Sequence, residues 1–194
     1  MSKLKAEVIK YSKKLNTTNL SALRSGNISI RTKENGVDGF YITPSGRKYS
    51  SLKTIDIVFV SLKGAFDKKK GKPSSEWRFH QDIYVNKKDA KAIVHAHSTC
   101  ATAVSTHQKS IPAFHYMVAV AGGEDIKCAK YSTFGTRSLS KNILSALKNR
   151  SACLISNHGQ IAFGENLEKT FELAQEIENI CHQYINALRI GIPK

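Results

Sequence analysis

The 194-residue chain contains no apolar run that approaches the roughly 20 residues needed to cross a membrane. It has no internal repeat, low-complexity stretch or linker, and no signal peptide at its start. Only four cysteines are present, without any Cys-x-x-Cys pair, which indicates free thiols in a reducing compartment. We therefore expect one soluble, cytoplasmic domain over residues 1–194 that has no membrane partner.

Acidic residues are scarce: 15 stand against 30 basic ones, which gives a formal net charge of +15. Such a surplus can indicate nucleic acid as a partner. Most of it lies in residues 1–72, which hold 16 basic and 5 acidic groups, largely lysines of a predicted first helix and of the turn Asp67–Lys72. No aromatic-interleaved basic strand or zinc-finger spacing accompanies the charge. We expect a solvated lysine surface and no nucleic-acid partner.

Three histidines carry the strongest chemical signal. If Ala92–His97 forms a strand, the side chains of His95 and His97 point to the same face, because strand side chains alternate. His158 follows a second apolar run, Ala152–Ile155, so it also lies at a strand end. An isolated His-x-His pair often binds nothing, but three converging imidazoles can hold a zinc-type ion with a fourth position open. We predict a metal site.

Hydrophobic periodicity predicts alternating helices and strands. Helices are expected over Lys5–Leu15, Ser98–His107, Arg137–Lys148 and Leu167–Leu188, and a further helix is expected to begin within Pro73–His80; strands are expected over Asn27–Arg31, Gly39–Thr43, Ile55–Leu62 and Ala92–His97. The first two strands form a hairpin around an Asn-Gly turn. This order of elements indicates either an α+β domain or a three-layer α/β/α domain.

Small polar residues gather at several predicted turns. Glu76 lies at a predicted helix start, where a carboxylate can ligate a metal and then act as a base, although an ordinary first-turn glutamate has the same sequence signature. Ser74 and Ser75 offer hydroxyl and backbone N–H groups for an anion. The turns Ser25–Asn27 and Thr43–Gly46 can cradle a phosphate. Together with the histidines, these turns indicate an enzyme acting on a small, phosphorylated, metal-chelating substrate.

Nine motifs follow one another between about residue 5 and residue 190: Ser25–Ser29, Ile42–Gly46, Lys72–His80, Val94–His97, Ile111–Met117, Ala121–Gly123, Thr133–Arg137, Leu147–Arg150 and Asn157–Gly159. In this order they resemble the class II L-fuculose-phosphate aldolases. The resemblance implies a single α/β/α domain with a mixed, largely antiparallel central sheet. It also implies a homotetramer whose active site lies near a subunit interface.

The resemblance further implies an aldehyde-lyase with one Zn²⁺ per subunit. The implied ligands are His95, His97, His158 and, in the resting enzyme, Glu76. Glu76 then serves as the acid/base, and zinc as the Lewis acid. The implied reaction reversibly cleaves a ketose 1-phosphate, such as L-fuculose 1-phosphate, into dihydroxyacetone phosphate and an aldehyde such as L-lactaldehyde.

Further roles follow from the resemblance position by position. The residues that match phosphate-binding positions are Gly26, Asn27, Ser45, Gly46, Ser74 and Ser75. Tyr116 matches a tyrosine that reaches the neighbouring subunit's site, and Phe134 matches a residue that shapes the aldehyde pocket. We expect two departures from the family: the tyrosine-bearing tail after the last helix has no counterpart in this sequence, and Arg24 places a cation near the phosphate pocket. Both bear on the choice of aldehyde more than on the type of reaction.

Other functions on the same scaffold remain open. A pentulose-phosphate 4-epimerase or a methylthioribulose-phosphate dehydratase also presents three zinc histidines. The epimerases resemble Ser-Ser-Asp at the helix start, whereas this chain has Glu76 there, which favours an aldolase. A non-catalytic binding module, as in a cytoskeletal domain that has lost its zinc ligands, is disfavoured because all three histidines and Glu76 are present.

Overall fold

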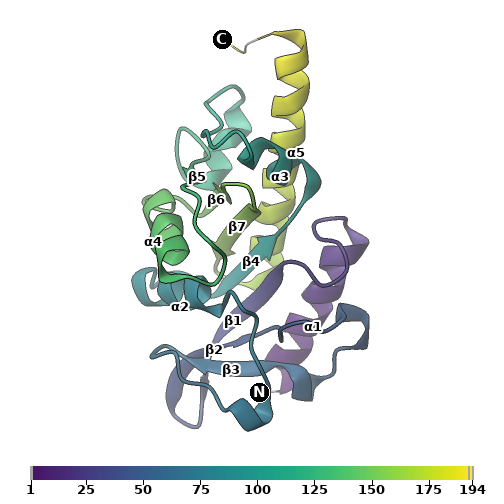
Figure 1. The fold of residues 1–194 in the computed structure, drawn as a ribbon, viewed down its shortest axis with the longest axis vertical. Coiled ribbons are helices and arrows are strands. Elements are labelled where there is room, and N and C mark those ends of the chain that lie inside the picture. The colour runs from purple at the N-terminus through teal and green to yellow at the C-terminus, as the bar shows by residue number, and fades with distance from the viewer. Residues whose placement is uncertain (1, 192, 194) are drawn as a thin grey trace.

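A seven-stranded sheet forms the centre of the molecule in the computed structural model, which describes residues 2–191 and 193. The strands are β1 (Asn27–Glu34), β2 (Val37–Ile42), β3 (Val58–Ser61), β4 (Ala92–Ala96), β5 (Cys128–Ala129), β6 (Ala152–Ile155) and β7 (Gly159–Gly164). Their order across the sheet is β3-β2-β1-β4-β7-β6-β5 (Figure 1). All neighbouring pairs are antiparallel except β5 and β6. The expected mixed, largely antiparallel sheet is confirmed.

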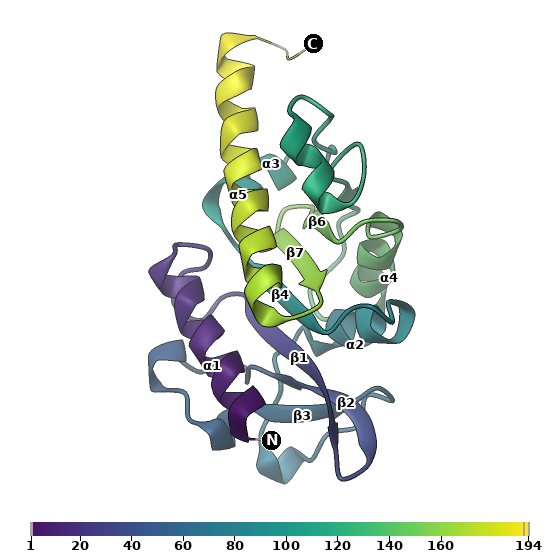
Figure 2. The same cartoon turned by 180° about the vertical axis from the view of Figure 1, so that it is seen from behind.

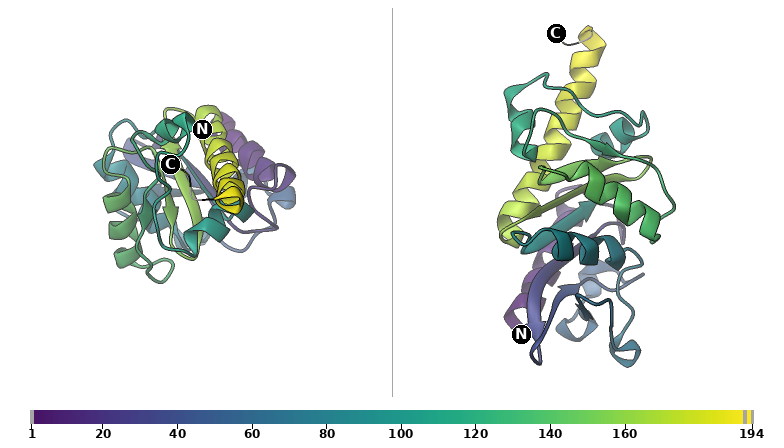
Figure 3. Two further views of the ribbon diagram at one scale, coloured as in Figure 1. Left: turned by 90° about the horizontal axis from the view of Figure 1, so that it is seen from above. Right: turned by 90° about the vertical axis from the view of Figure 1, so that its left-hand side faces the viewer.

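Helices cover both faces of this sheet, which confirms the three-layer α/β/α architecture. They are α1 (Ser2–Thr17), α2 (Trp77–Asn86), α3 (Thr99–Ser105), α4 (Arg137–Ala146) and α5 (Leu167–Ile190). Helices α1, α3 and α5 pack on one face, and α2 and α4 on the other (Figures 2 and 3). Each face of the sheet has its own hydrophobic core, because successive side chains of β4 point to opposite faces. Val94 packs in the core beneath α1, α3 and α5, and Ile93 packs in the core beneath α2 and α4.

Local sequence explains most element boundaries. The β1–β2 hairpin turns at Asn35 and Gly36, both with positive φ, as expected for an Asn-Gly turn. The strand expected over Ile55–Leu62 was too long: residues Thr54–Asp56 form a 3-10 turn in which Asp56 accepts a hydrogen bond from the Lys53 N–H, and β3 begins only at Val58. The helix start predicted at Glu76 is correct to within one residue, because Glu76 is the N-cap residue and α2 begins at Trp77.

Helix α5 has the predicted apolar stripe, but its last turns extend beyond the body of the domain (Figure 1). The buried side chains of this stripe extend as far as Cys181, whereas Leu188 is 45% exposed. Among the described residues, none of the helices combines the length and apolar character required to cross a membrane.

Candidate active site

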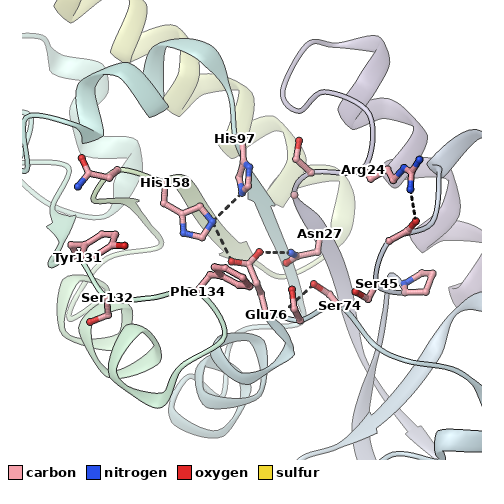
Figure 4. Close-up of a pocket in the computed structure, with 16 residues that line it drawn as sticks. Arg24, Asn27, Ser45, Ser74, Glu76, His97, Tyr131, Ser132, Phe134 and His158 are labelled. Carbon is pink, nitrogen blue, oxygen red and sulfur yellow. Dashed lines mark hydrogen bonds and ion pairs between the residues drawn. The ribbon is translucent and has the colours of Figure 1, made fainter.

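The predicted histidines and Glu76 converge at one point of the fold. His95 lies at the end of β4, His97 directly follows that strand, His158 lies in the turn between β6 and β7, and Glu76 immediately precedes α2. His97 Nε2 is 2.9 Å from His95 Nε2. It is 3.0 Å from His158 Nε2, a contact drawn in Figure 4. The two oxygens of Glu76 each lie 3.2 Å from an imidazole, Oε2 from His95 and Oε1 from His158.

Hydrogen bonding around the cluster leaves two of its inner atoms, one on His95 and one on Glu76, able to bind a metal. Gln160 O can only accept, so His95 Nδ1, at 2.8 Å, must donate to it, and His95 Nε2 is left with a free lone pair. Glu76 Oε1 is buried and accepts no hydrogen bond from any described residue. Four ligands held at 2.0–2.1 Å in a tetrahedron would be about 3.3 Å apart, close to the observed separations. The residues therefore fit a divalent metal with nitrogen and oxygen ligands.

Electrostatics favour the ligating forms of these groups. Burial, followed by the neighbouring His95 and His158, lowers the pKa of His97 to about 3. Burial alone would raise the pKa of Glu76, but His95 and His158 hold that pKa well below its usual range. A neutral imidazole and an ionised carboxylate are the forms that bind metal.

A cavity of about 410 Å³ opens beside the cluster (Figure 4). Of the residues predicted for the site, those that line the cavity are Gly26, Asn27, Ser45, Gly46, Ser74, Ser75, Glu76, His97, Phe134 and His158. His95 lies behind them and is fully buried. Tyr116 does not line this cavity; it begins a 3-10 helix elsewhere and is 81% exposed. The structure thus assembles every predicted residue of the site except Tyr116 within one subunit.

The polar turns converge on one side of the cavity. Gly26 and Gly46 both have positive φ, at 77° and 71°. Arg24 Nη1 donates to Gly46 O at 3.1 Å, which holds the guanidinium across both turns. Ser74 Oγ accepts from the Glu76 N–H at 3.3 Å, so this serine also positions the segment that carries the carboxylate.

Sequence reasoning missed several residues around the cavity. Tyr131 and Ser132 line it beside Phe134, and Asn157 lines it next to His158. Tyr131 and Ser132 immediately precede the motif Thr133–Arg137, and Asn157 begins the motif Asn157–Gly159, so proximity to a motif was the available signal. Ser21 accepts a hydrogen bond from the backbone N–H of His97 at 2.9 Å, and no pattern in the sequence pointed to it.

Substituting Gly26 with alanine is expected to destabilise the fold next to the metal cluster. A Cβ at this position would lie 2.6 Å from His95 O and 2.7 Å from Ser21 Oγ. Gly36→Ala is the matched control, because Gly36 also has a positive φ of 81° but nothing within 4 Å of an added Cβ. We expect Gly26→Ala to lower the free energy of unfolding by about 1–3 kcal/mol more than Gly36→Ala, measured by urea denaturation. Equal losses of unfolding free energy in the two variants would show that the contacts of the added Cβ with His95 O and Ser21 Oγ do not destabilise the fold.

Comparisons with known proteins agree with this geometry. The profile of the Class II Aldolase and Adducin N-terminal domain family matches residues 6–185. The 5-methylthioribulose-1-phosphate/5-deoxyribulose-1-phosphate aldolase of Rhodospirillum rubrum is 42% identical over 191 residues, covering 98% of this chain and 84% of the relative. The L-fuculose phosphate aldolase of Escherichia coli is 44% identical over 192 residues, covering 99% and 87%. A solved L-fuculose 1-phosphate aldolase superposes with a TM-score of 0.93 at 38% identity, covering 100% of this chain and 90% of the other.

Proposed function

Because the chain belongs to the class II aldolase and adducin N-terminal domain family, we propose that it is a zinc-dependent aldolase acting on a ketose 1-phosphate such as L-fuculose 1-phosphate. The products are dihydroxyacetone phosphate and an aldehyde such as L-lactaldehyde. The observation that carries the proposal is the convergence of three imidazoles and Glu76 beside a cavity lined by small polar turns.

A second candidate substrate is 5-deoxyribulose 1-phosphate or its methylthio analogue. It is favoured by the Rhodospirillum rubrum aldolase, which is about as similar to this chain as the Escherichia coli enzyme. Any ketose 1-phosphate cleaved between C3 and C4 yields dihydroxyacetone phosphate, so the two candidates differ only in the aldehyde. Incubating the metal-loaded protein with dihydroxyacetone phosphate and a panel of aldehydes, followed by product identification, distinguishes them.

In the proposed mechanism, the three histidines would hold the zinc, with Glu76 as a fourth ligand only until substrate binds, and the bound metal would supply a Lewis acid that stabilises negative charge on substrate oxygens. Glu76 removes the proton from the carbon that forms the new bond. Asn27 Nδ2 donates to Glu76 Oε2 at 2.9 Å, whereas Oε1 accepts no hydrogen bond from any described residue and is therefore the oxygen proposed to take the proton. Burial keeps water away from this carboxylate, which is 6% exposed.

The substrate phosphate is proposed to lie among the polar turns. The groups available to it are the Ser45, Ser74 and Ser75 side chains and the turns at Gly26 and Gly46. The second Nδ2 hydrogen of Asn27 also remains available, because only one is donated to Glu76. Arg24 adds a positive charge over the same turns. Phe134, 65% exposed at the cavity wall, is proposed to contact the aldehyde.

Tyr116 is proposed to complete the site of a neighbouring subunit in a homotetramer. Its 81% exposure and its position outside its own subunit's cavity support a role across an interface. A subunit alone would then lack one group that contacts the substrate, and activity would depend on assembly.

Replacing Arg24 with glutamine is expected to weaken substrate binding. One charge-assisted hydrogen bond to a phosphate contributes roughly 1.5–3 kcal/mol, which corresponds to about a 10- to 100-fold rise in KM. The kcat should stay within about twofold, because the Arg24 side chain hydrogen-bonds to Gly46 O and not to Glu76. Arg47→Gln is the matched control, since Arg47 pairs with Asp56 instead. Equal changes in KM for both variants would show that Arg24 does not bind the substrate phosphate.

A further inference from the structure

A buried chain of hydrogen bonds runs from Glu76 into the core, away from the cavity. Asn27 Nδ2 donates to Glu76 Oε2 at 2.9 Å, and Asn27 Oδ1 lies 2.5 Å from His80 Nε2. His80 Nδ1 is 2.7 Å from Ser29 Oγ, which is 2.8 Å from the Tyr84 hydroxyl. His80 and Ser29 are fully buried, and Asn27 and Tyr84 are at most 2% exposed. The metal cluster and the phosphate turns do not use His80.

Only one arrangement of protons satisfies this chain. An ionised Glu76 can only accept, so Asn27 must turn its NH₂ group toward Glu76 and its carbonyl oxygen toward His80. His80 Nε2 must then carry a hydrogen. Burial lowers the pKa of His80 to about 3, with a smaller contribution from His95, so the ring is neutral and its Nδ1 must accept from the Ser29 hydroxyl. The Ser29 oxygen in turn accepts from the Tyr84 hydroxyl.

Resting on the proposed function, we propose that His80 is a positioning residue that locks the Asn27 amide so that it donates to Glu76 Oε2 and leaves Oε1 to take the proton. If the amide flipped, its carbonyl oxygen would face the carboxylate and repel it. The His80 ring itself is held by stacking on Phe79, at 4.9 Å between centroids and 22° between planes. His80 therefore acts on the reaction through Asn27 and not by touching substrate.

Kinetics of three variants test this role. His80→Phe keeps a flat ring against Phe79 but removes both hydrogen bonds, and we expect kcat to fall about 10- to 100-fold with KM within about twofold and metal content unchanged. His80→Gln retains an Nε2 donor for Asn27 and should recover part of the lost kcat. Tyr84→Phe, the control, removes only the last hydroxyl of the chain, so it should lower the unfolding midpoint without changing kcat by more than about twofold.

A kcat within twofold of the native value in His80→Phe would overturn the proposal, and so would an equal fall in Tyr84→Phe. If His80→Phe does not fold, His80→Leu takes its place, because leucine also offers no donor to Asn27 Oδ1. His80→Leu must then show the same loss of kcat.

A second measurement needs no substrate. Long-range ¹H–¹⁵N NMR of the metal-loaded protein should show His80 as the Nε2–H tautomer, in native protein and in Tyr84→Phe, with His80→Gln identifying the signal by its absence. A hydrogen on Nδ1 would contradict the chain of donors. If the native protein cleaves no ketose phosphate while His80 is the Nε2–H tautomer, the proposed function fails and the arrangement around Asn27 stands.

Discussion

Replacing His97 with alanine is expected to remove most of the bound metal and to lower the activity more than about 100-fold. This loss exceeds the one caused by removing a residue that only hydrogen-bonds to a metal ligand. His97 Nε2 lies within 3.0 Å of both other imidazole Nε2 atoms, so it occupies the centre of the ligand set. Its ring lines the cavity and belongs to neither apolar core cluster, so the variant should still fold. Metal per chain is measured by elemental analysis after dialysis against a fixed zinc concentration.

The matched control for this prediction is His107→Ala, because His107 is exposed and lies outside the cavity. It should retain the native metal content and activity. Full metal occupancy in His97→Ala would refute the assignment of the three histidines as ligands.

Replacing Glu76 with glutamine is expected to abolish proton transfer while the fold is retained. Glutamine has nearly the same shape, and its side-chain oxygen can still accept from Asn27, but it cannot take a proton. A positioned general base typically contributes 10²- to 10⁴-fold, so deuterium exchange at C3 of dihydroxyacetone phosphate should slow by roughly that factor. The exchange is followed by NMR in deuterated water, without any aldehyde.

Two checks make this result specific. Metal content is measured alongside, because a variant that has lost its metal would also stop exchanging. Glu178→Gln is the matched control, since Glu178 accepts from the backbone N–H groups of Cys100 and Ala101 and is not part of the cavity. Undiminished exchange in metal-loaded Glu76→Gln would exclude Glu76 as the base.

Local patterns in the sequence predicted the parts of the site that depend on one strand or one turn. Strand alternation placed His95 and His97 on the same face, and the apolar run before His158 placed that histidine at a strand end. The pairing of β1 with β4 is a long-range property, and it sets Asn27 directly opposite His95. No local pattern reveals that register, so the contact between Asn27 and Glu76 could not be predicted.

The proposed role of His80 could not be predicted from the sequence either, because it also depends on long-range contacts. A histidine one turn after Glu76, next to Phe79 and one turn before Ile83 and Tyr84, has the signature of an ordinary core residue. Its partners Asn27 and Ser29 are about 50 positions away and alternate on one face of β1. Periodicity in α5 likewise identified an apolar stripe but not the point where the domain ends, beyond which Leu188 is exposed.

The most direct test of the central claim compares metal-stripped, zinc-restored and Glu76→Gln protein for cleavage of L-fuculose 1-phosphate and of 5-deoxyribulose 1-phosphate. The release of dihydroxyacetone phosphate is measured by an assay that couples it to enzymatic reduction of this product. The account predicts that zinc restores release from at least one of these ketose phosphates and that zinc-loaded Glu76→Gln releases almost none. Release that does not depend on metal, or that Glu76→Gln retains, would contradict it, as would no release from either substrate by zinc-loaded native protein.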